Sequence, residues 1–463
     1  MTVPSAGGRP PAPARARRLM GANGRPAQAA VRLILGLAGL VLAGTVLLWL
    51  PASGARRPLT LDEALFTAVS GLATTGLTVI TPGYDLSLFG QIVLLVLMQV
   101  GGIGFMVGAV VVFRLLGRRI TLAERVALRD ALGEVSTNAV VRLTGRVVAG
   151  VLLIEGIGAV LLWFNWQRFY GPGRAAYFAI FHAVSAFCNA SFDLFSGSPD
   201  APAGFPTNPF TLFTLTGLVI IGGLGMPVLA DLAQAVRGGR LSLHSRLTLA
   251  VAAILLALGT LALFLGETRP GTLFAQEPWP RRLLLAYFHS ATSRTSGFVL
   301  QPLADMAPAN ILVLTALMFV GGAPVSTSGG ITTSTFAVLM LAMWRYVQGH
   351  GRIVAGGRTI PAETVLKAVA IVVTALLVVI AVTWLLLLTQ PATLSEALFE
   401  AVSAFATSGF TLGLTPHLNL FGRLLIALTM FWGRLGALTV VVALARTARP
   451  AAVQFPEEQI LIG

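Results

Sequence analysis

Residues 73–77 read Ala73-Thr74-Thr75-Gly76-Leu77, and three further stretches of the chain repeat this phrase with small changes. The copies are Cys188-Asn189-Ala190-Ser191-Phe192, Arg294-Thr295-Ser296-Gly297-Phe298 and Ala406-Thr407-Ser408-Gly409-Phe410. Their fourth residues, at 76, 191, 297 and 409, are 115, 106 and 112 residues apart. Each copy follows a short apolar helical pattern and precedes a long apolar run. This near-constant period indicates that the chain contains four copies of one unit.

The composition indicates a protein that crosses a membrane several times. Of 463 residues, 56% are hydrophobic and 11% are charged, whereas soluble domains carry about 25% charged residues. Apolar stretches near the roughly 20 residues that a spanning helix needs lie at Leu33–Leu50, Val147–Phe164, Leu247–Leu265 and Ala368–Leu388.

The net charge of +14 does not indicate a nucleic-acid partner, because the basic residues are not grouped around aromatic side chains on one soluble face. Instead, 22 of the 32 Lys and Arg residues lie in the arm, loops and tail on one side of the predicted spans. By the positive-inside rule, both termini are expected in the cytoplasm, with lipid around the spans. The expected location is the inner (plasma) membrane of a bacterial cell.

Each unit is predicted to contain an outer helix, a short re-entrant helix, the phrase and an inner helix. The short helices are expected at Leu61–Leu72, Ala175–Phe187, Leu283–Thr292 and Leu394–Phe405, and they are too short to span. Non-helical backbone at membrane depth is tolerated only where protein or water surrounds it, so four such returns imply one central cavity. The predicted fold is an all-α integral membrane protein with eight transmembrane helices and four re-entrant pore helices around a pseudo-fourfold pore.

The expected domain boundaries follow from these units. They are a disordered basic arm at 1–29, repeat one at 30–116, a cytoplasmic linker helix at 117–142, repeat two at 143–236, repeat three at 247–348, repeat four at 366–446 and a C-terminal tail at 447–463.

The repeated phrases have the chemistry of an ion selectivity filter. A re-entrant helix that runs inward points its carboxyl end, which carries about half a negative charge, at the bilayer centre. Small Thr, Ser and Gly residues then present backbone carbonyls that replace the hydration shell of a cation. Glycine is expected because the required backbone angles cost other residues about 1–2 kcal/mol. The phrases hold no carboxylate, which favours a monovalent ion. The predicted ion-binding residues are Thr74, Thr75, Gly76, Asn189, Ala190, Ser191, Thr295, Ser296, Gly297, Thr407, Ser408 and Gly409.

The third inner helix is predicted to break at residues 321–335, which are too rich in Gly, Pro and Ser to stay helical. The break is interpreted as an intramembrane gate loop beneath the filter, and a packed kink is the alternative. Arg434 is expected below the filter as a positive barrier or in a structural ion pair. Arg294 is expected to hydrogen-bond loop carbonyls. The predicted gate residues are Gly321, Gly322, Pro324, Ser326, Gly329, Gly330, Thr332 and Arg434.

Two acidic residues lie within apolar helical patterns, Glu155 and Glu400. They are interpreted as satisfied carboxylates that bind filter-loop amides, and coupling to Na+ or a proton is the alternative. The runs 101–104 and 222–225 are expected in mid-helix, where their glycines allow close packing of neighbouring helices.

These phrases resemble the Trk/Ktr/HKT superfamily of potassium transporters, and most closely its Ktr-type membrane subunit, KtrB. The resemblance covers residues 30–463 and includes the four filters, residues 321–335, Gly433-Arg434-Leu435-Gly436 and the tail from Pro456 to Gly463. It implies K+ uptake, a homodimer with one pore per chain, and gating by a cytoplasmic KtrA-like ring of RCK subunits that bind ATP or ADP. No organic cofactor is expected in this chain.

Two positions depart from the family pattern. Ser191 stands where the other phrases have Gly, and in plant HKT relatives such a serine, in the first repeat, accompanies Na+ permeation. Relatives commonly have Lys where this chain has Thr332. The alternatives to a K+ pore are therefore a Na+-coupled or H+-coupled cation carrier and a Na+-permeable HKT-like transporter.

Two other classes are disfavoured. A voltage-gated channel would need helices with Arg at every third position, and an enzyme would need convergent His, Cys or paired acids. The sequence shows neither pattern.

Overall fold

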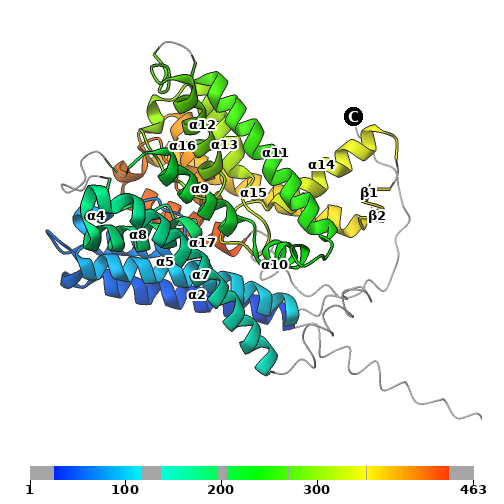
Figure 1. Cartoon of the computed structure of the whole chain (residues 1–463), viewed down its shortest axis with the longest axis horizontal. Helices are drawn as coiled ribbons and strands as arrows, with labels where there is room; N and C mark the ends of the chain where they lie inside the picture. The colour runs from blue at the N-terminus through cyan, green and yellow to red at the C-terminus, as the bar shows by residue number, and fades with distance from the viewer. Residues whose placement is uncertain are drawn as a thin grey trace, which may run out of the picture.

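The structure, a computed structural model, describes residues 25–115, 137–196, 204, 206–268, 271–350 and 352–436. This part of the chain is almost entirely helical, as predicted (Figure 1). Its strands form one two-residue hairpin of β1 (Val354–Ala355) and β2 (Arg358–Thr359), beside the end of α14.

The helices form four sets, each with a long outer helix, a short helix and an inner helix, and the inner helix of the second and third sets is divided into two. The first set is α2 (Arg25–Trp49), α3 (Leu61–Leu72) and α5 (Leu88–Leu115), with the single turn α4 (Pro82–Asp85) before α5. The second is α7 (Thr137–Tyr170), α8 (Pro172–Phe187), α9 (Pro209–Gly223) and α10 (Met226–Ala235). The third is α11 (Leu243–Gly266), α12 (Trp279–Ser293), α13 (Pro308–Phe319) and α14 (Thr333–Val347). The fourth is α15 (Ala362–Thr389), α16 (Leu394–Ala406) and α17 (Leu420–Leu435).

Local sequence signals explain where the short helices begin. Capping boxes start α3, through Thr60 and Glu63, and α16, through Thr393 and Glu396. Helices α8 and α12 begin three and four residues before the predicted points, because Pro172 and Pro280 occupy the first helical turn, where proline is favoured.

The run at 222–225 corrects a prediction. It was expected in mid-helix, but α9 ends at Gly223 and α10 leaves it at an angle of 104°. Gly225 has a φ of 76°, and Pro227 lies in the first turn of α10. A left-handed glycine followed by proline ends one helix and starts another. The run at 101–104 does lie in mid-helix, within α5.

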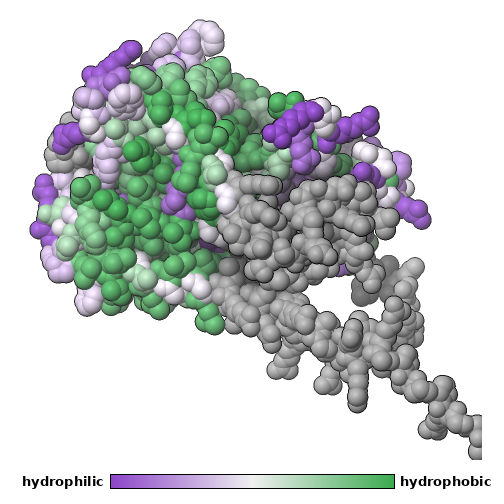
Figure 2. Space-filling view, turned by 60° about the horizontal axis from the view of Figure 1, so that its bottom comes forward, coloured by the Kyte–Doolittle hydropathy of each residue, from purple (hydrophilic) through white to green (hydrophobic). Residues whose placement is uncertain are grey.

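The surface is suited to lipid. Within the described residues, α7 from Val147, α11 and α15 are long and apolar enough to cross a membrane, and the bent pair α9 and α10 could add a fourth span. Large apolar side chains such as Leu153, Ile380 and Trp384 are more than half exposed. Figure 2 shows a broad hydrophobic face with hydrophilic residues gathered toward its edges.

The inner helix of each set packs against the short helix of the next set. The pairs are α5 with α8, α9 with α12, α13 with α16, and α17 with α3, so the fourth set closes on the first. Each short helix also buries one phenylalanine at a comparable position, and all four are at most 1% exposed: Phe66, Phe181, Phe288 and Phe399.

Several predicted segments lie wholly or mainly outside the described residues. They are the basic arm, the linker helix at 117–142 and the C-terminal tail. The last six positions of the predicted linker belong to α7, which begins at Thr137.

Candidate functional site

The four phrases meet at one place, although they lie far apart in the sequence. A Cβ atom added to the glycine of one phrase would overlap the carbonyl oxygen of the third residue of a neighbouring phrase. This holds for Gly76 with Ala190, Gly297 with Ser408, and Gly409 with Thr75. The second and third phrases join where the Gly297 N–H donates to Ser191 Oγ. The contacts run from first to second, third, fourth and back to first, so the phrases form a closed ring.

Three of the four short helices end in the same way, with a Schellman-type turn. The N–H of the third phrase residue donates to the carbonyl oxygen five residues earlier, at 2.8 Å for Thr75, 2.8 Å for Ala190 and 2.9 Å for Ser408. The second phrase residue is left-handed, with φ of 51° at Thr74, 54° at Asn189 and 50° at Thr407. This turn brings the phrase across the carboxyl end of its helix, where the helix dipole is negative.

The third short helix ends differently because one residue fewer separates its hydroxyl residue from the phrase. A hydroxyl residue stands six positions before the fourth phrase residue in units one, two and four, at Ser70, Ser185 and Ser403, but five positions before it in unit three, at Thr292. The Ser296 N–H accordingly donates only four residues back, to Thr292 O at 2.8 Å, and neither Thr295 nor Gly297 is left-handed.

The expected reason for the filter glycines holds in two phrases. Gly76 and Gly409 have φ of 91° and 88°. At Gly297 the prediction is wrong, because its φ is not left-handed. A side chain is excluded there by the backbone of Gly409, whose carbonyl carbon would lie 2.5 Å from an added Cβ.

Ser191 occupies the left-handed position that glycine fills in phrases one and four, with a φ of 63°. A non-glycine residue there costs about 1–3 kcal/mol. Its hydroxyl accepts a hydrogen bond from the Gly297 N–H and donates to Ser408 O at 3.3 Å. The serine therefore adds a side-chain oxygen at the meeting point of three phrases.

The loop between α13 and α14 lies against the second residue of three phrases. Thr74 Oγ1 donates to Thr327 O at 3.1 Å. The side chains of Asn189 and Thr327 are hydrogen-bonded at 2.5 Å, and the Gly329 N–H donates to Thr407 Oγ1 at 2.9 Å. The side chains of Asn189 and Thr295 are bonded at 3.1 Å, so the second and third phrases also connect at this level.

Backbone hydrogen bonds close the neck of this loop. The Gly321 N–H donates to Ile331 O at 2.9 Å, and the Thr333 N–H donates to Gly322 O at 2.9 Å. The predicted break at 321–335 therefore exists, but its last three residues already belong to α14.

The remaining predicted gate residues lie within or beside the loop. Ser326 Oγ accepts from the Ser328 N–H at 3.2 Å, and Gly330 has a φ of 74°. Pro324 O lies against Gly225 at the bend of α9 and α10. Thr332 caps α14 by accepting from the Thr335 N–H at 3.4 Å.

Arg434 approaches the loop from α17. Its guanidinium donates to Thr327 O and, at 2.6 Å, to Gly101 O on α5. The side chain is 3% exposed, so the positive charge lies buried beside the loop and not in the ring of phrases. Thr327 O is thus shared by Arg434 and Thr74.

The two isolated acids bind side chains, whereas filter-loop amides were expected. Glu155 accepts from Gln99 Nε2 at 2.8 Å and lies 3.7 Å from the Cys188 thiol. Glu400 accepts from the hydroxyl of Thr411 at 2.8 Å and from that of Thr415. Both carboxylates are buried and paired with neutral donors.

An equivalence among the inner helices was missed from the sequence. A glycine of α5, α9 and α17 lies directly against the carbonyl oxygen of the residue that immediately precedes a phrase: Gly101 against Leu72, Gly222 against Phe187, and Gly433 against Phe405. Matching the glycine runs at 101–104, 222–225, 321–324 and 433–436 to one another would have found it. In that alignment Arg434 takes the place of the second glycine.

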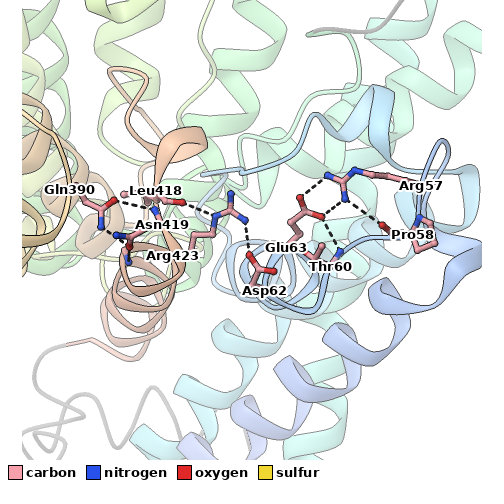
Figure 3. A network of polar contacts seen from close by, with 10 residues as sticks. Arg57, Pro58, Thr60, Asp62, Glu63, Gln390, Leu418, Asn419 and Arg423 are labelled. Atoms are coloured by element: carbon pink, nitrogen blue, oxygen red, sulfur yellow. Dashed lines mark hydrogen bonds and ion pairs between the residues drawn. The ribbon is translucent and has the colours of Figure 1, made fainter.

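An ion pair links the first and fourth units at the ring's closing seam (Figure 3). Asp62, in the first turn of α3, accepts from Arg423 Nη1 of α17 at 2.6 Å, and Arg423 Nε donates to Leu418 O at 3.0 Å. Burial acts to raise the pKa of Asp62, but hydrogen bonds from Thr60 and Arg423 outweigh it and lower that pKa. On its other side, α3 is held by Glu63, which accepts from Arg57 at 2.7 Å.

The chain is similar in sequence to known cation transport proteins. The TrkH family model, described as "Cation transport protein", matches residues 40–452. The chain is 36% identical to Ktr system potassium uptake protein B of Vibrio alginolyticus, over 93% of this chain and 94% of that protein. It is 35% identical to the protein of the same name from Bacillus subtilis, over 93% and 96%.

The chain is also similar to another uptake protein and to a solved transporter structure. The chain is 34% identical to potassium/sodium uptake protein NtpJ of Enterococcus hirae, over 92% of this chain and 95% of that one. In fold it is similar to the crystal structure of the potassium transporter TrkH from Vibrio parahaemolyticus, with a TM-score of 0.72 at 19% identity, over 91% of this chain and 85% of that one.

Proposed function

We propose, since this chain is a member of the TrkH family of cation transport proteins, that it takes up K+ as the ion-translocating subunit of a Ktr-like system. Membership makes it a membrane cation transporter, which agrees with the predictions that it is not an enzyme and that it lies in a membrane. The observation that carries the proposal is the closed ring of four phrases around one point.

The ring suits a dehydrated monovalent cation for two physical reasons. Carbonyl oxygens of Thr75, Ala190 and Ser408 all face a neighbouring phrase, and such oxygens can replace water around an alkali ion. The short helices aim their negative ends at the phrases, which lowers the electrostatic cost of a cation there. K+ is the substrate of this site, and the filter consists of the twelve residues predicted above.

The proposed architecture has eight spans and four re-entrant helices. In it, α2, α7, α11 and α15 are outer helices, while α3, α8, α12 and α16 enter from outside and return through the phrases. The unit boundaries at 30–116, 143–236, 247–348 and 366–446 and the cytoplasmic position of both termini belong to this proposal. The surplus of basic residues on one side supports the orientation.

The loop of residues 321–335 is the proposed gate. It contacts three phrases, and Arg434 holds it through Thr327 O. Opening requires that a bound ligand or partner stabilise a second loop position. The proposed partner is a KtrA-like ring of RCK subunits that bind ATP or ADP at the cytoplasmic face of a homodimer, an inference that the "Ktr system" names of the relatives support.

A Na+-permeable or Na+-coupled or H+-coupled transporter is the second candidate. Ser191 in the ring and the potassium/sodium name of one relative favour Na+ as an alternative ion. Initial uptake that depended on external Na+ or pH would support coupling, and equal Rb+ and Na+ fluxes would support a non-selective pore.

Growth rescue tests the proposal. Bacteria that lack their own K+ uptake systems should grow at low external K+ when they express this chain with an RCK partner, and grow less well with the chain alone. A membrane-inserted chain that rescued under neither condition would contradict K+ uptake.

A further inference from the structure

Arg294 distinguishes the third unit from the other three. It is the first residue of its phrase, where the other phrases have the small residues Ala73, Cys188 and Ala406. The unit with this arginine is also the unit with the shortened helix end and the loop at 321–335. A positively charged side chain at membrane depth costs free energy, and its presence therefore indicates a function.

The guanidinium of Arg294 reaches the neck of the loop. Its Nη2 donates to Gly321 O at 3.1 Å, and its Nη1 lies 3.5 Å from Ala252 O on α11. Gly321 is the residue whose N–H closes the neck onto Ile331 O. One side chain from the base of a filter phrase thus fastens the place where the loop leaves α13.

A small pocket with unpartnered polar atoms lies beside this contact. A pocket with a volume of about 30 Å³ is lined by Arg294, by Gly322, Ala323 and Thr333 around the loop neck, and by Thr248 of α11. Within the described residues, Arg294 Nε and Thr248 Oγ1 are buried without a hydrogen-bond partner. These two donors are available to carbonyls of a displaced neck.

Two arginines therefore hold the loop at different points. Arg434 binds its middle at Thr327 O from unit four, and Arg294 binds its neck at Gly321 O from unit three. We propose that Arg294 is a positioning residue that keeps the gate loop closed by binding the Gly321 carbonyl, which couples the third filter phrase to the gate. This inference rests on the proposed pore function and concerns its regulation.

The experiment compares the full-length wild type with Arg294→Gln, Arg294→Lys and the control Arg282→Gln, each reconstituted into liposomes without a partner. Arg282 is a matched control because it lies on α12, the helix that Arg294 caps, and donates to the loop carbonyls of Ala275 and Glu277 at 3.2 and 3.1 Å. Its Nε also has no hydrogen-bond partner among the described residues. The readouts are the Rb+ flux and the ratio of Rb+ to Na+ flux.

Arg294→Gln should raise partner-independent Rb+ flux about tenfold, the effect of losing one hydrogen bond from a charged group. Arg294→Lys should give an intermediate rise because lysine keeps the charge but lacks the planar fork. Arg282→Gln should match the wild type, and the flux ratio should stay constant throughout.

Equal fluxes in wild type and Arg294→Gln would overturn the inference and leave the pore intact. A rise in Na+ flux proportionally larger than the rise in Rb+ flux, and so a lower flux ratio, would overturn it too, because Arg294 would then support the filter only. If Arg294→Gln does not assemble, the flux of Arg294→Lys decides. No flux of either ion in any variant, with or without an RCK partner, would overturn the proposed function itself.

Discussion

The inner helices of the first and third units carry the same glycine pair, yet only the first stays a helix through it. In α5, Gly101 and Gly102 pack in mid-helix against Leu72 O and the Cys188 thiol. In unit three the corresponding Gly321 and Gly322 form the neck of a loop. One packing motif therefore has two outcomes in the same molecule.

The residues that follow the glycines account for the difference. Gly104 continues α5, whereas Pro324 takes the matched position in unit three and cannot donate the hydrogen bond that a helix requires. In unit two, Gly225 and Pro227 produce the 104° bend. Glycine permits close approach of the neighbouring backbone, and a proline soon after the glycine interrupts the helix.

The largest effect on stability is expected when a proline is placed in α5, compared with the removal of the proline from the loop of unit three. Gly104→Pro should destabilise the protein by about 3 kcal/mol or more because it breaks α5, whereas Pro324→Gly in the loop should cost under about 1 kcal/mol. Thermal unfolding in detergent measures both. Comparable losses in the two variants would break the comparison between units one and three.

The second-largest effect is expected when a larger side chain replaces the glycine that packs against Leu72. Gly101→Leu places a side chain into the backbone of Leu72 and should cost about 1–3 kcal/mol or more, with loss of K+ uptake. Gly104→Leu is the control, since a Cβ there meets only Val100 at 3.9 Å. An unaffected Gly101→Leu would show that the close approach is not needed.

Replacing Ser191 tests the ring where the phrases differ. Ser191→Gly removes the hydroxyl that bridges Gly297 and Ser408 and relieves the left-handed backbone, so the K+ to Na+ flux ratio should rise about fivefold, equivalent to about 1 kcal/mol. Competition between Rb+ and Na+ uptake measures it. An unchanged ratio would separate Ser191 from selectivity.

The smallest effect on stability is expected for variants of the ion pair between Asp62 and Arg423, which joins units one and four. Asp62→Asn and Arg423→Gln should each cost under about 1 kcal/mol, and the double variant should cost less than their sum if the ion pair is the shared cause. Strict additivity would instead assign Asp62 to the dipole of α3 alone.

The pH dependence of the seam follows from the lowered pKa of Asp62. The carboxylate's contribution is complete above its unfolded pKa of about 3.9 and is lost as pH falls through the lower folded value. Wild type should therefore lose more thermal stability than Asp62→Asn when the pH falls from 6 to 3. Parallel losses would contradict the ion pair.

Much of this arrangement could be predicted from the sequence, because repeats and apolar runs are local signals. The short helix α3 begins and ends at the predicted residues, and the break between α13 and α14, at 320–332, overlaps the predicted 321–335. The partners of Glu155 and Arg434 could not be predicted, since they come from other units of the chain. Glu400 binds Thr411 and Thr415 of its own unit, where folding of the segment after the phrase brings their hydroxyls to it. The one-residue shortening before Thr295 was visible, but only by comparing the four units position by position.

Anomalous scattering from Rb+ in crystals of this protein tests the central claim most directly. The account predicts Rb+ peaks on the axis enclosed by Gly76, Ser191, Gly297 and Gly409, within coordinating distance of their phrases' backbone oxygens. Rb+ bound elsewhere in a transport-competent protein, with no peak inside this ring, would contradict it.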